Sequence, residues 1–385
     1  MSMSMSMSMS ISMDDDSNHK PQKKEQDKEH VLTVLESLKR ASKDLQHLPS
    51  FIARSPEPAI TAILELGSEI DAALDSVPGL SELSKLLSDL KSVLDELEKS
   101  QGLGLVPLIR RQASYYRVWR IAWEIEAQAQ GYLDKEIVLN LMRTLSRSDC
   151  REDAKLKALA AFEDRVEQGF HMGLQDLILK SKVFSVLESK LCDPDCPQAV
   201  RECSASAIVA LVKFNRNVFV GLVLMGPTVG ALVSIGSCRS IRALSSLVRL
   251  IRSPLIDEMY AHGEITRIAK LLESQDYDTQ ISSLECVCEI AYYGRKEVVE
   301  AILDNGIVER LMELQRSEDD ERHSPFGSCV VRFAVQVEVG EGLTQQEKRE
   351  MKTEILRRVK EASVSEAEAA SISAEVLWGS SPLSF

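Results

Sequence analysis

The sequence predicts an all-α protein in which a helical bundle is followed by a solenoid of helical repeats. Aromatic residues make up only 5% of the 385 residues, whereas 44% are hydrophobic and 27% are charged. Apolar residues recur at helical spacing along most of the chain. From about residue 134 a unit made of a small residue, a short helix, a polar turn and a longer helix is repeated.

The first 28 residues alternate Met with Ser and then become strongly charged. They contain neither the apolar core of a signal peptide nor the Arg-rich amphipathic pattern of a transit peptide, so we expect residues 1–28 to be a disordered tail. The longest apolar run, 218–235, is broken by Gly226 and Pro227. No run therefore has the length of a membrane span.

Residues 29–131 predict a four-helix bundle with short connections. The first helix ends before Pro49, and Ser55 with Pro56 has the pattern of an N-cap followed by proline in the first turn. Glycine-containing connections follow the second and third helices. The expected helices cover approximately 31–48, 57–74, 83–97 and 106–130.

Residues 134–380 predict the solenoid, with about five to six repeats. Gly226, Gly263 and Gly306 begin three copies that are 37 and 43 residues apart, and Ser181 holds the equivalent place 45 residues before Gly226. An earlier copy starts near residue 134, and a degenerate last copy follows residue 343. In that last copy two pairs have the spacing of a capping box: Thr344 with Glu347, and Ser365 with Glu368.

The segments "DNGIVERLMELQRSEDD" and "HGEITRIAKLLESQDYDTQISSLECVCEIAYYG" resemble the armadillo repeat in their order of glycine, helix, turn and helix. This resemblance implies a right-handed α-solenoid. A helical bundle before such repeats is similar to plant armadillo-repeat proteins, including plant U-box ubiquitin ligases. Those ligases carry a U-box between bundle and repeats, and the step from Gly131 to Asp134 leaves no room for one.

The stretch "MGPTVGALVSIGSCRS", residues 225–240, has the glycine content of a phosphate-binding loop. Its glycines do not have the spacing of a P-loop, and no lysine follows them. We therefore expect a turn between helices. The histidines His171, His262 and His323 fall at predicted helix ends or turns, and acidic residues such as Asp193 and Asp276 fall where helix caps are expected. The sequence thus predicts no catalytic residue and no enzymatic activity.

The eight cysteines do not have the pattern of a disulfide scaffold or a metal site. Cys192, Cys196 and Cys203 fit no common zinc-ligand spacing. We expect no metal, no cofactor and a reducing compartment, which favours a cytoplasmic protein, with nuclear and membrane-peripheral locations left open. The formal net charge of −13 argues against nucleic acid as a partner.

Armadillo proteins usually carry asparagine at one position of the last helix of each repeat, where it binds the backbone of an extended peptide in a concave groove. The resemblance places this position at Ala161, Lys213, Arg249, Glu289 and Arg332. None of these is asparagine, so importin-type recognition of nuclear-import signals is not expected. Three are basic and predict a groove for acidic or phosphorylated segments. Arginines that either extend this groove or face outward are Arg239, Arg242 and Arg252.

A second surface is predicted in residues 108–128, where basic and aromatic residues alternate. The basic residues are Arg110, Arg111, Arg117 and Arg120. Tyr116, Trp119 and Trp123 have helical spacing, which favours packing of the bundle against the first repeat. Stacking on nucleic acid or contact with a membrane surface are the alternatives.

These observations predict a non-catalytic scaffold or adaptor that binds other proteins in the groove of its solenoid. Two alternatives stay open: a substrate adaptor in a ubiquitin-ligase pathway, and a peripheral membrane protein. The sequence leaves the oligomeric state open.

Overall fold

The computed structural model describes residues 19–46, 57–73, 80–99, 105–147, 149–317 and 325–378. Within these ranges the side chains of residues 19–28, 57–59, 70–73, 97–98 and 105–111 are not described. The described residues form helices and turns without any strand, which confirms the all-α prediction. The chain divides into two compact units, Met1–Glu136 and Ile137–Phe385.

The first unit is a bundle built from α1 (His19–Gln46), α2 (Glu57–Ala73), α3 (Ser81–Lys99) and the first part of α4 (Leu105–Ser146). Its apolar core takes residues from all four helices, because each presents one stripe at helical spacing. Helix α1 packs along α2, and α2 packs along α3. The fully buried side chains include Leu35, Leu38, Ile60, Ile63, Leu90, Val118 and Ile125.

The N-terminal helix is longer than the sequence predicts. Helix α1 begins at His19, so residues 19–28, which we expected in the disordered tail, are helical. This stretch is rich in Lys, Glu and Gln, which have high helix propensity, but it lacks the apolar periodicity that marks a buried helix. Residues 1–18 and Ser55 lie outside the described part of the chain.

The fourth helix does not end near residue 130 as expected, because α4 continues without a break from Leu105 to Ser146. Gly131 lies inside this helix, and a Cβ atom there would meet nothing within 4 Å. A single helical glycine costs only about 1 kcal/mol relative to alanine, which the good helix formers on both sides offset. The division into two units falls within α4, after Glu136.

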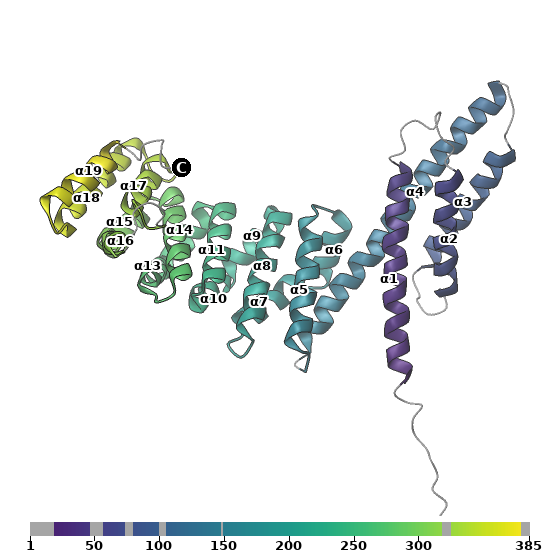
Figure 1. Cartoon of the computed structure of the whole chain (residues 1–385), viewed down its shortest axis with the longest axis horizontal. Helices are drawn as coiled ribbons and strands as arrows, with labels where there is room; N and C mark the ends of the chain where they lie inside the picture. The colour runs from purple at the N-terminus through teal and green to yellow at the C-terminus, as the bar shows by residue number, and fades with distance from the viewer. Residues whose placement is uncertain are drawn as a thin grey trace, which may run out of the picture. The chain divides into compact units, whose positions relative to one another are not determined.

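The second unit is a stack of helices that shares one continuous apolar core. It begins with the end of α4 and α5 (Glu152–Glu167), continues through four triplets of helices, and ends with a pair (Figure 1). The first triplet is α6 (Met172–Lys180), α7 (Val183–Cys192) and α8 (Gln198–Phe214), and the second is α9 (Arg216–Met225), α10 (Thr228–Ile235) and α11 (Cys238–Ile251). The third is α12 (Ser253–Ala261), α13 (Glu264–Lys270) with a short 3₁₀ turn (Leu271–Glu273), and α14 (Tyr277–Tyr293). The fourth triplet and the final pair are α15 (Lys296–Asp304), α16 (Ile307–Arg316), α17 (Cys329–Val339), α18 (Gln345–Ala362) and α19 (Glu366–Trp378).

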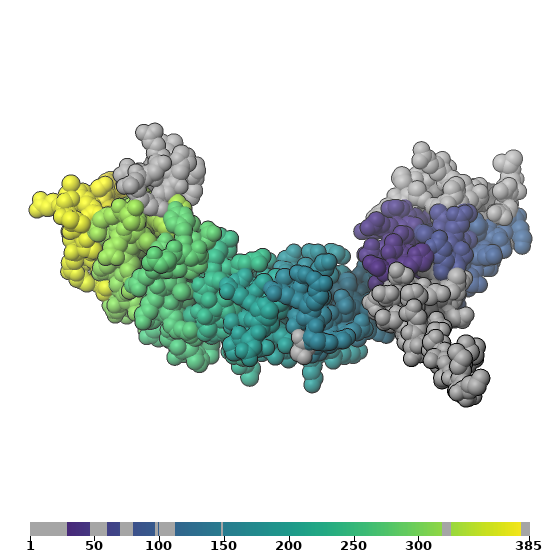
Figure 2. Space-filling model, turned by 60° about the horizontal axis from the view of Figure 1, so that its bottom comes forward, coloured from purple at the N-terminus to yellow at the C-terminus, as the bar shows by residue number. Residues whose placement is uncertain are grey.

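The last helix of each triplet packs against the last helix of the next. Helices α5, α8, α11, α14 and α17 therefore lie side by side in this order. We call these five the ladder helices. In the space-filling view the second unit follows an arc from teal to yellow (Figure 2). Stacking of this kind buries one face of each repeat against its neighbours and leaves the outward face of each ladder helix in solvent.

Left-handed residues start the middle helices of three triplets. Gly263 and Gly306 have φ angles of 70° and 73° and begin α13 and α16, as the repeat pattern predicts. In the first triplet this place belongs to Lys182, with φ 54°, and not to Ser181. A lysine at this position gives no sequence signal, so the pattern placed the start one residue too early.

In the second triplet Gly226 lies shortly before the middle helix, α10, but it has a different backbone geometry. Its backbone is extended, with φ −98°, and a Cβ atom there would collide with the carboxylate of Glu188. The Thr228 hydroxyl donates a 2.6 Å hydrogen bond to that carboxylate. At the far end of α10, Gly236 is left-handed, and Ser237 forms a capping box with Ser240. The stretch 225–240 is therefore a pair of turns around a short helix, as expected.

None of the described helices is, by itself, long and apolar enough to cross a membrane. Only α9 and α10 taken together reach the required length and composition, and they are bent by 69° at Gly226 and Pro227.

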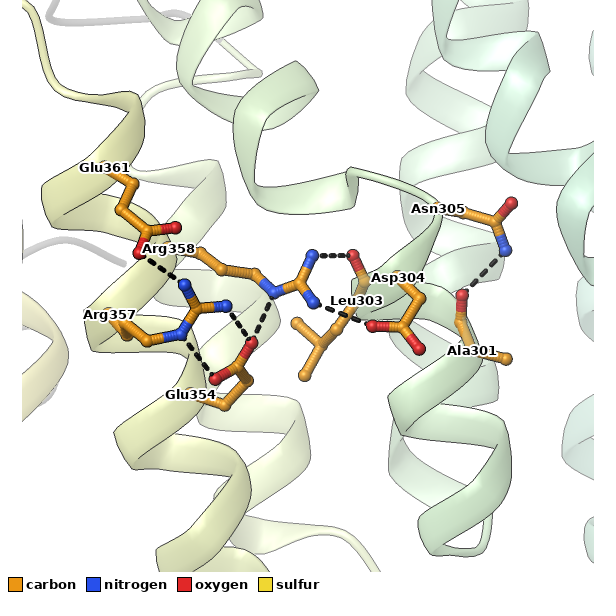
Figure 3. Close-up of polar contacts among 8 residues, drawn as sticks. All are labelled: Ala301, Leu303, Asp304, Asn305, Glu354, Arg357, Arg358 and Glu361. Carbon is orange, nitrogen blue, oxygen red and sulfur yellow. Dashed lines mark hydrogen bonds and ion pairs between the residues drawn. The ribbon is translucent and has the colours of Figure 1, made fainter.

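Polar side chains stabilise the C-terminal pair, and Figure 3 shows the contacts that link α18 to the end of α15. Thr344 and Glu347 form the predicted capping box at the start of α18. At α19 the Ser365 hydroxyl accepts from the Glu368 backbone as expected, but the Glu368 carboxylate accepts from the Val364 backbone and not from Ser365. Further along α18, Arg358 donates to the carbonyl oxygen of Leu303, at the end of α15.

Candidate functional site

The candidate surface is the exposed side of the ladder helices, which we call the ladder face. All five positions expected in the groove lie on ladder helices. Ala161, Lys213, Arg249 and Arg332 are exposed, and Glu289 is half-buried. The structure does not give these five residues one common environment, and their contacts separate them into distinct parts of the face.

Arg249 and Glu289 form an ion pair across neighbouring ladder helices. The Nε atom of Arg249 lies 3.5 Å from Oε1 of Glu289. Burial raises the pKa of Glu289, and the Arg249 guanidinium opposes that rise. The pair leaves this part of the face close to neutral, although the sequence predicted a positive charge at Arg249.

Arg332 is engaged within its own repeat. Its Nη1 atom donates a 2.8 Å hydrogen bond to the carbonyl oxygen of Pro325, in the turn before α17. Arg252, an expected extension of the groove, lies over the ring of Tyr293 and donates to Glu341 at 3.2 Å. Both arginines therefore bond to residues of the solenoid itself.

The positive charge gathers instead in a pocket of about 260 Å³ between α5, α8 and α11. We call it the α8–α11 pocket. Lys213 lies on its rim with Arg239 and Arg242, and Glu163 is the acidic residue in its lining. The other lining residues are Ser206, Val209, Ala243 and Ser246. Ala161 is not among them.

Helical spacing explains the hollow. Ser206, Val209 and Lys213 follow one another at i, i+3 and i+7 on α8, and Arg239, Arg242 and Ser246 do so on α11. Small side chains on both helices, Ser206 on α8 and Ala243 with Ser246 on α11, leave the space, and long cationic side chains line it as well. Sequence reasoning singled out the cations but missed the small residues, although their spacing is visible in the sequence.

Glu163 lies among charges of both signs. Burial raises its pKa, and the neighbouring carboxylates of Glu167 and Asp164 raise it further. Lys213 and Arg239 act in the opposite direction. The pocket therefore contains a carboxylate that its cations stabilise only in part.

A larger cavity of about 580 Å³ lies at the turns around α9 and α10. Residues of the stretch 225–231 line it, with Met225 almost fully exposed. Its arginines are already engaged: Arg267 pairs with Glu264 at 2.8 Å, and Arg201 donates to the Leu191 carbonyl at 2.9 Å. This cavity offers apolar surface but no uncommitted charge.

Three aromatic residues of α4 lie outside the bundle core, on an exposed side of the helix. Tyr116, Trp119 and Trp123 are 68%, 40% and 54% exposed. The bundle core uses the other stripe of the helix, with Tyr115, Val118, Ala122, Ile125 and Ala129.

The arginines beside these aromatics are paired where they are described. Arg117 lies 2.6 Å from the carboxylate of Glu96, and Arg120 lies 3.6 Å from that of Glu124. The side chains of Arg110 and Arg111 lie outside the described part of the chain.

Histidine, aspartate and cysteine side chains that could act in catalysis have structural roles or are buried. The His171 ring accepts from the Leu174 backbone as the cap of α6, and Asp276 caps α14 through the Thr279 backbone. His323 lies outside the described residues. Burial raises the pKa of Cys286, Cys288 and Cys329 to about 12, so these thiols are poor nucleophiles. Among the described residues no cluster has the ligands to hold a metal ion.

No protein-family model matches the sequence, and no curated protein matches it. The similar solved structures include a designed armadillo repeat protein, which is 15% identical, covers 63% of this chain and 98% of its own, and has a TM-score of 0.44. A designed armadillo repeat protein in complex with the peptide (KR)4 has the same identity and coverage and a TM-score of 0.45. An engineered protein is 18% identical, with 91% and 88% coverage and a TM-score of 0.47. Because these TM-scores are below 0.5, the fold is assigned from the contacts between this chain's own helices.

Proposed function

We propose that this chain is a non-catalytic scaffold that binds an extended segment of a partner protein along the ladder face. The observation that supports this proposal is the row of five adjacent ladder helices with the α8–α11 pocket between three of them. Such a row offers regularly spaced side chains to one extended chain, and repeat proteins use surfaces of this kind for binding. Cations around the pocket favour a segment with acidic or phosphorylated side chains.

A double charge reversal tests the proposal. The purified chain is immobilised and incubated with a degenerate pool of 12-residue peptides, and the retained peptides are sequenced by mass spectrometry. We expect wild type to enrich acidic peptides, and we expect Lys213→Glu with Arg249→Glu to lose that enrichment while its helical circular dichroism is unchanged. Lys270→Glu is the matched control, because Lys270 is exposed on α13, outside the ladder. Equal enrichment by wild type and the double variant would exclude the ladder face as the peptide-binding surface.

The exposed aromatics of α4 favour a second candidate, contact with a membrane surface. Tyr116, Trp119 and Trp123 follow one face of the helix, and such residues partition to the boundary between water and lipid. Flotation with phosphatidylcholine vesicles tests it. We expect wild type to rise with the vesicles, and a Trp119→Ala, Trp123→Ala variant to stay at the bottom of the gradient. Absence of wild-type protein from the vesicle fraction would exclude this second candidate.

A further inference from the structure

The cations of the α8–α11 pocket make no close contact with a carboxylate among the described residues. Lys213 Nζ lies 4.0 Å from Glu167 Oε1, and Arg239 Nη1 lies 3.8 Å from Glu202 Oε2, both beyond hydrogen-bond distance. Within the described ranges, neither these two residues nor Arg242 donates a side-chain hydrogen bond. By contrast, Arg249, Arg252 and Arg332 are engaged as described above.

The acidic neighbour of Arg239 receives its short hydrogen bonds from neutral donors. Glu202 is buried and accepts a 2.7 Å hydrogen bond from the Ser237 hydroxyl and a 2.8 Å bond from the Gln198 amide. Both bonds reach Oε1, whereas Oε2 faces Arg239 Nη1 at 3.8 Å. Arg239, whose side chain is 69% exposed, is free to turn its guanidinium toward a ligand.

Charge and geometry both indicate a phosphate group. Three cations and one carboxylate line the pocket, which gives it a formal charge of +2 when all are ionised. A phosphorylated side chain carries about −1.5 to −2 charges and three acceptor oxygens at pH 7. Lys213 lines the pocket from α8, and Arg239 and Arg242 line it from one turn of α11, so two helices supply three cationic donors. A carboxylate has only two oxygens and a single charge.

We propose that the α8–α11 pocket is a binding site for the phosphate of a phosphoserine or phosphothreonine in the bound partner segment. This inference rests on the proposed function, because the peptide backbone lies along the ladder face while its phosphate enters the pocket. The hydroxyl of Ser206 in the lining supplies a further donor to phosphate oxygens, whereas that of Ser246 donates a 3.0 Å hydrogen bond to the Arg242 carbonyl.

The test compares three fluorescein-labelled pools of degenerate 11-residue peptides, whose central residue is phosphoserine, glutamate or serine. Fluorescence anisotropy gives the affinity of the full chain for each pool. We expect wild type to bind the phosphoserine pool at least tenfold more tightly than the serine pool, and several-fold more tightly than the glutamate pool. In Arg242→Glu we expect the preference for phosphoserine over serine to fall below twofold.

Two control variants locate the effect. Arg332→Glu removes a ladder-face cation outside the pocket, and Lys270→Glu removes a cation outside the face. Both are expected to keep the tenfold preference, and circular dichroism checks that all variants fold. A phosphoserine preference that is absent in wild type, or unchanged in Arg242→Glu, overturns the phosphate site while peptide binding stands. Failure of all three pools to bind wild type overturns the proposed function as well.

Discussion

Arg249 on α11 and Glu289 on α14 pair across the boundary between two repeats, with 3.5 Å between Nε and Oε1. The pair connects adjacent ladder helices and neutralises a position that the sequence predicted to be basic. The positive charge that remains beside this pair is concentrated between α8 and α11, around Lys213 and Arg242.

Removing the carboxylate of this pair should strengthen the binding of acidic peptides. In Glu289→Gln the Arg249 guanidinium loses its anionic partner and becomes available to a ligand. We expect acidic peptides to bind about threefold more tightly, the scale of one solvent-screened charge. Glu297→Gln, an exposed change on α15, is the control and should leave affinity unchanged. Affinity equal in Glu289→Gln and wild type would show that the pair does not limit the charge of the face.

Arg358 should be important for stability, because its side chain joins α18 to the end of α15 (Figure 3). Only 14% of that side chain is exposed, and Nη2 lies 2.8 Å from Asp304 while Nε lies 2.7 Å from Glu354. We expect Arg358→Ala to lower the free energy of unfolding by about 2 kcal/mol, the scale of hydrogen bonds made by a charged group. Arg349→Ala, at an exposed position of the same helix, should change it by less than about 0.5 kcal/mol. Urea unfolding measures both, and equal effects would contradict this role.

The contribution of Glu354 should depend on pH. Hydrogen bonds from Arg357 and then Arg358 lower the pKa of Glu354 from 4.5 to about 2. A lowered pKa means that the folded state binds the proton less tightly than the unfolded state, so the stabilisation is complete above pH 4.5 and is lost as pH falls toward 2. The difference in unfolding free energy between wild type and Glu354→Gln should therefore be constant from pH 7 to 5 and shrink between pH 4.5 and 2. A difference that does not change over this range would contradict the assignment.

Two glycines should respond to alanine in opposite directions. Gly131 lies inside α4 with open space around it, so Gly131→Ala should stabilise the chain by about 0.5–1 kcal/mol. A Cβ atom on Gly342 would overlap the backbone carbonyl of Gly294, so Gly342→Ala should destabilise it by about 1–3 kcal/mol. Urea midpoints measure both. Destabilisation by Gly131→Ala would show that this glycine does not lie within a regular helix.

Much of the architecture was predictable because helical periodicity and turn residues are local signals. Leu35, Leu38 and Ile63 lie within the helices expected at 31–48 and 57–74, where apolar residues recur at helical spacing, and they are buried. Gly263 and Gly306 were assigned to repeat starts, and they are left-handed there. Lys182 was missed because a lysine in the sequence gives no sign that its backbone is left-handed. Gly131 was read as a stop because glycine often follows helices, whereas here the helix continues.

The candidate site was only partly predictable, because its charge balance depends on contacts between repeats. The repeat pattern located Lys213 and Arg249 on ladder helices. It did not reveal that Glu289 neutralises Arg249, since those residues are 40 positions apart in the sequence. It left open whether Arg239 and Arg242 extend the groove or face outward, because their proximity to Lys213 arises only when α8 and α11 stack.

Photo-cross-linking tests the central claim most directly. A benzophenone side chain is placed at Ser246, in the lining of the α8–α11 pocket, or at Lys270, outside the ladder. Each protein is irradiated with the acidic peptides that wild type retains, and the cross-linked fraction is measured by mass spectrometry. A ladder-face scaffold predicts at least tenfold more cross-linked peptide at Ser246 than at Lys270. Equal yields, or a higher yield at Lys270, would contradict it.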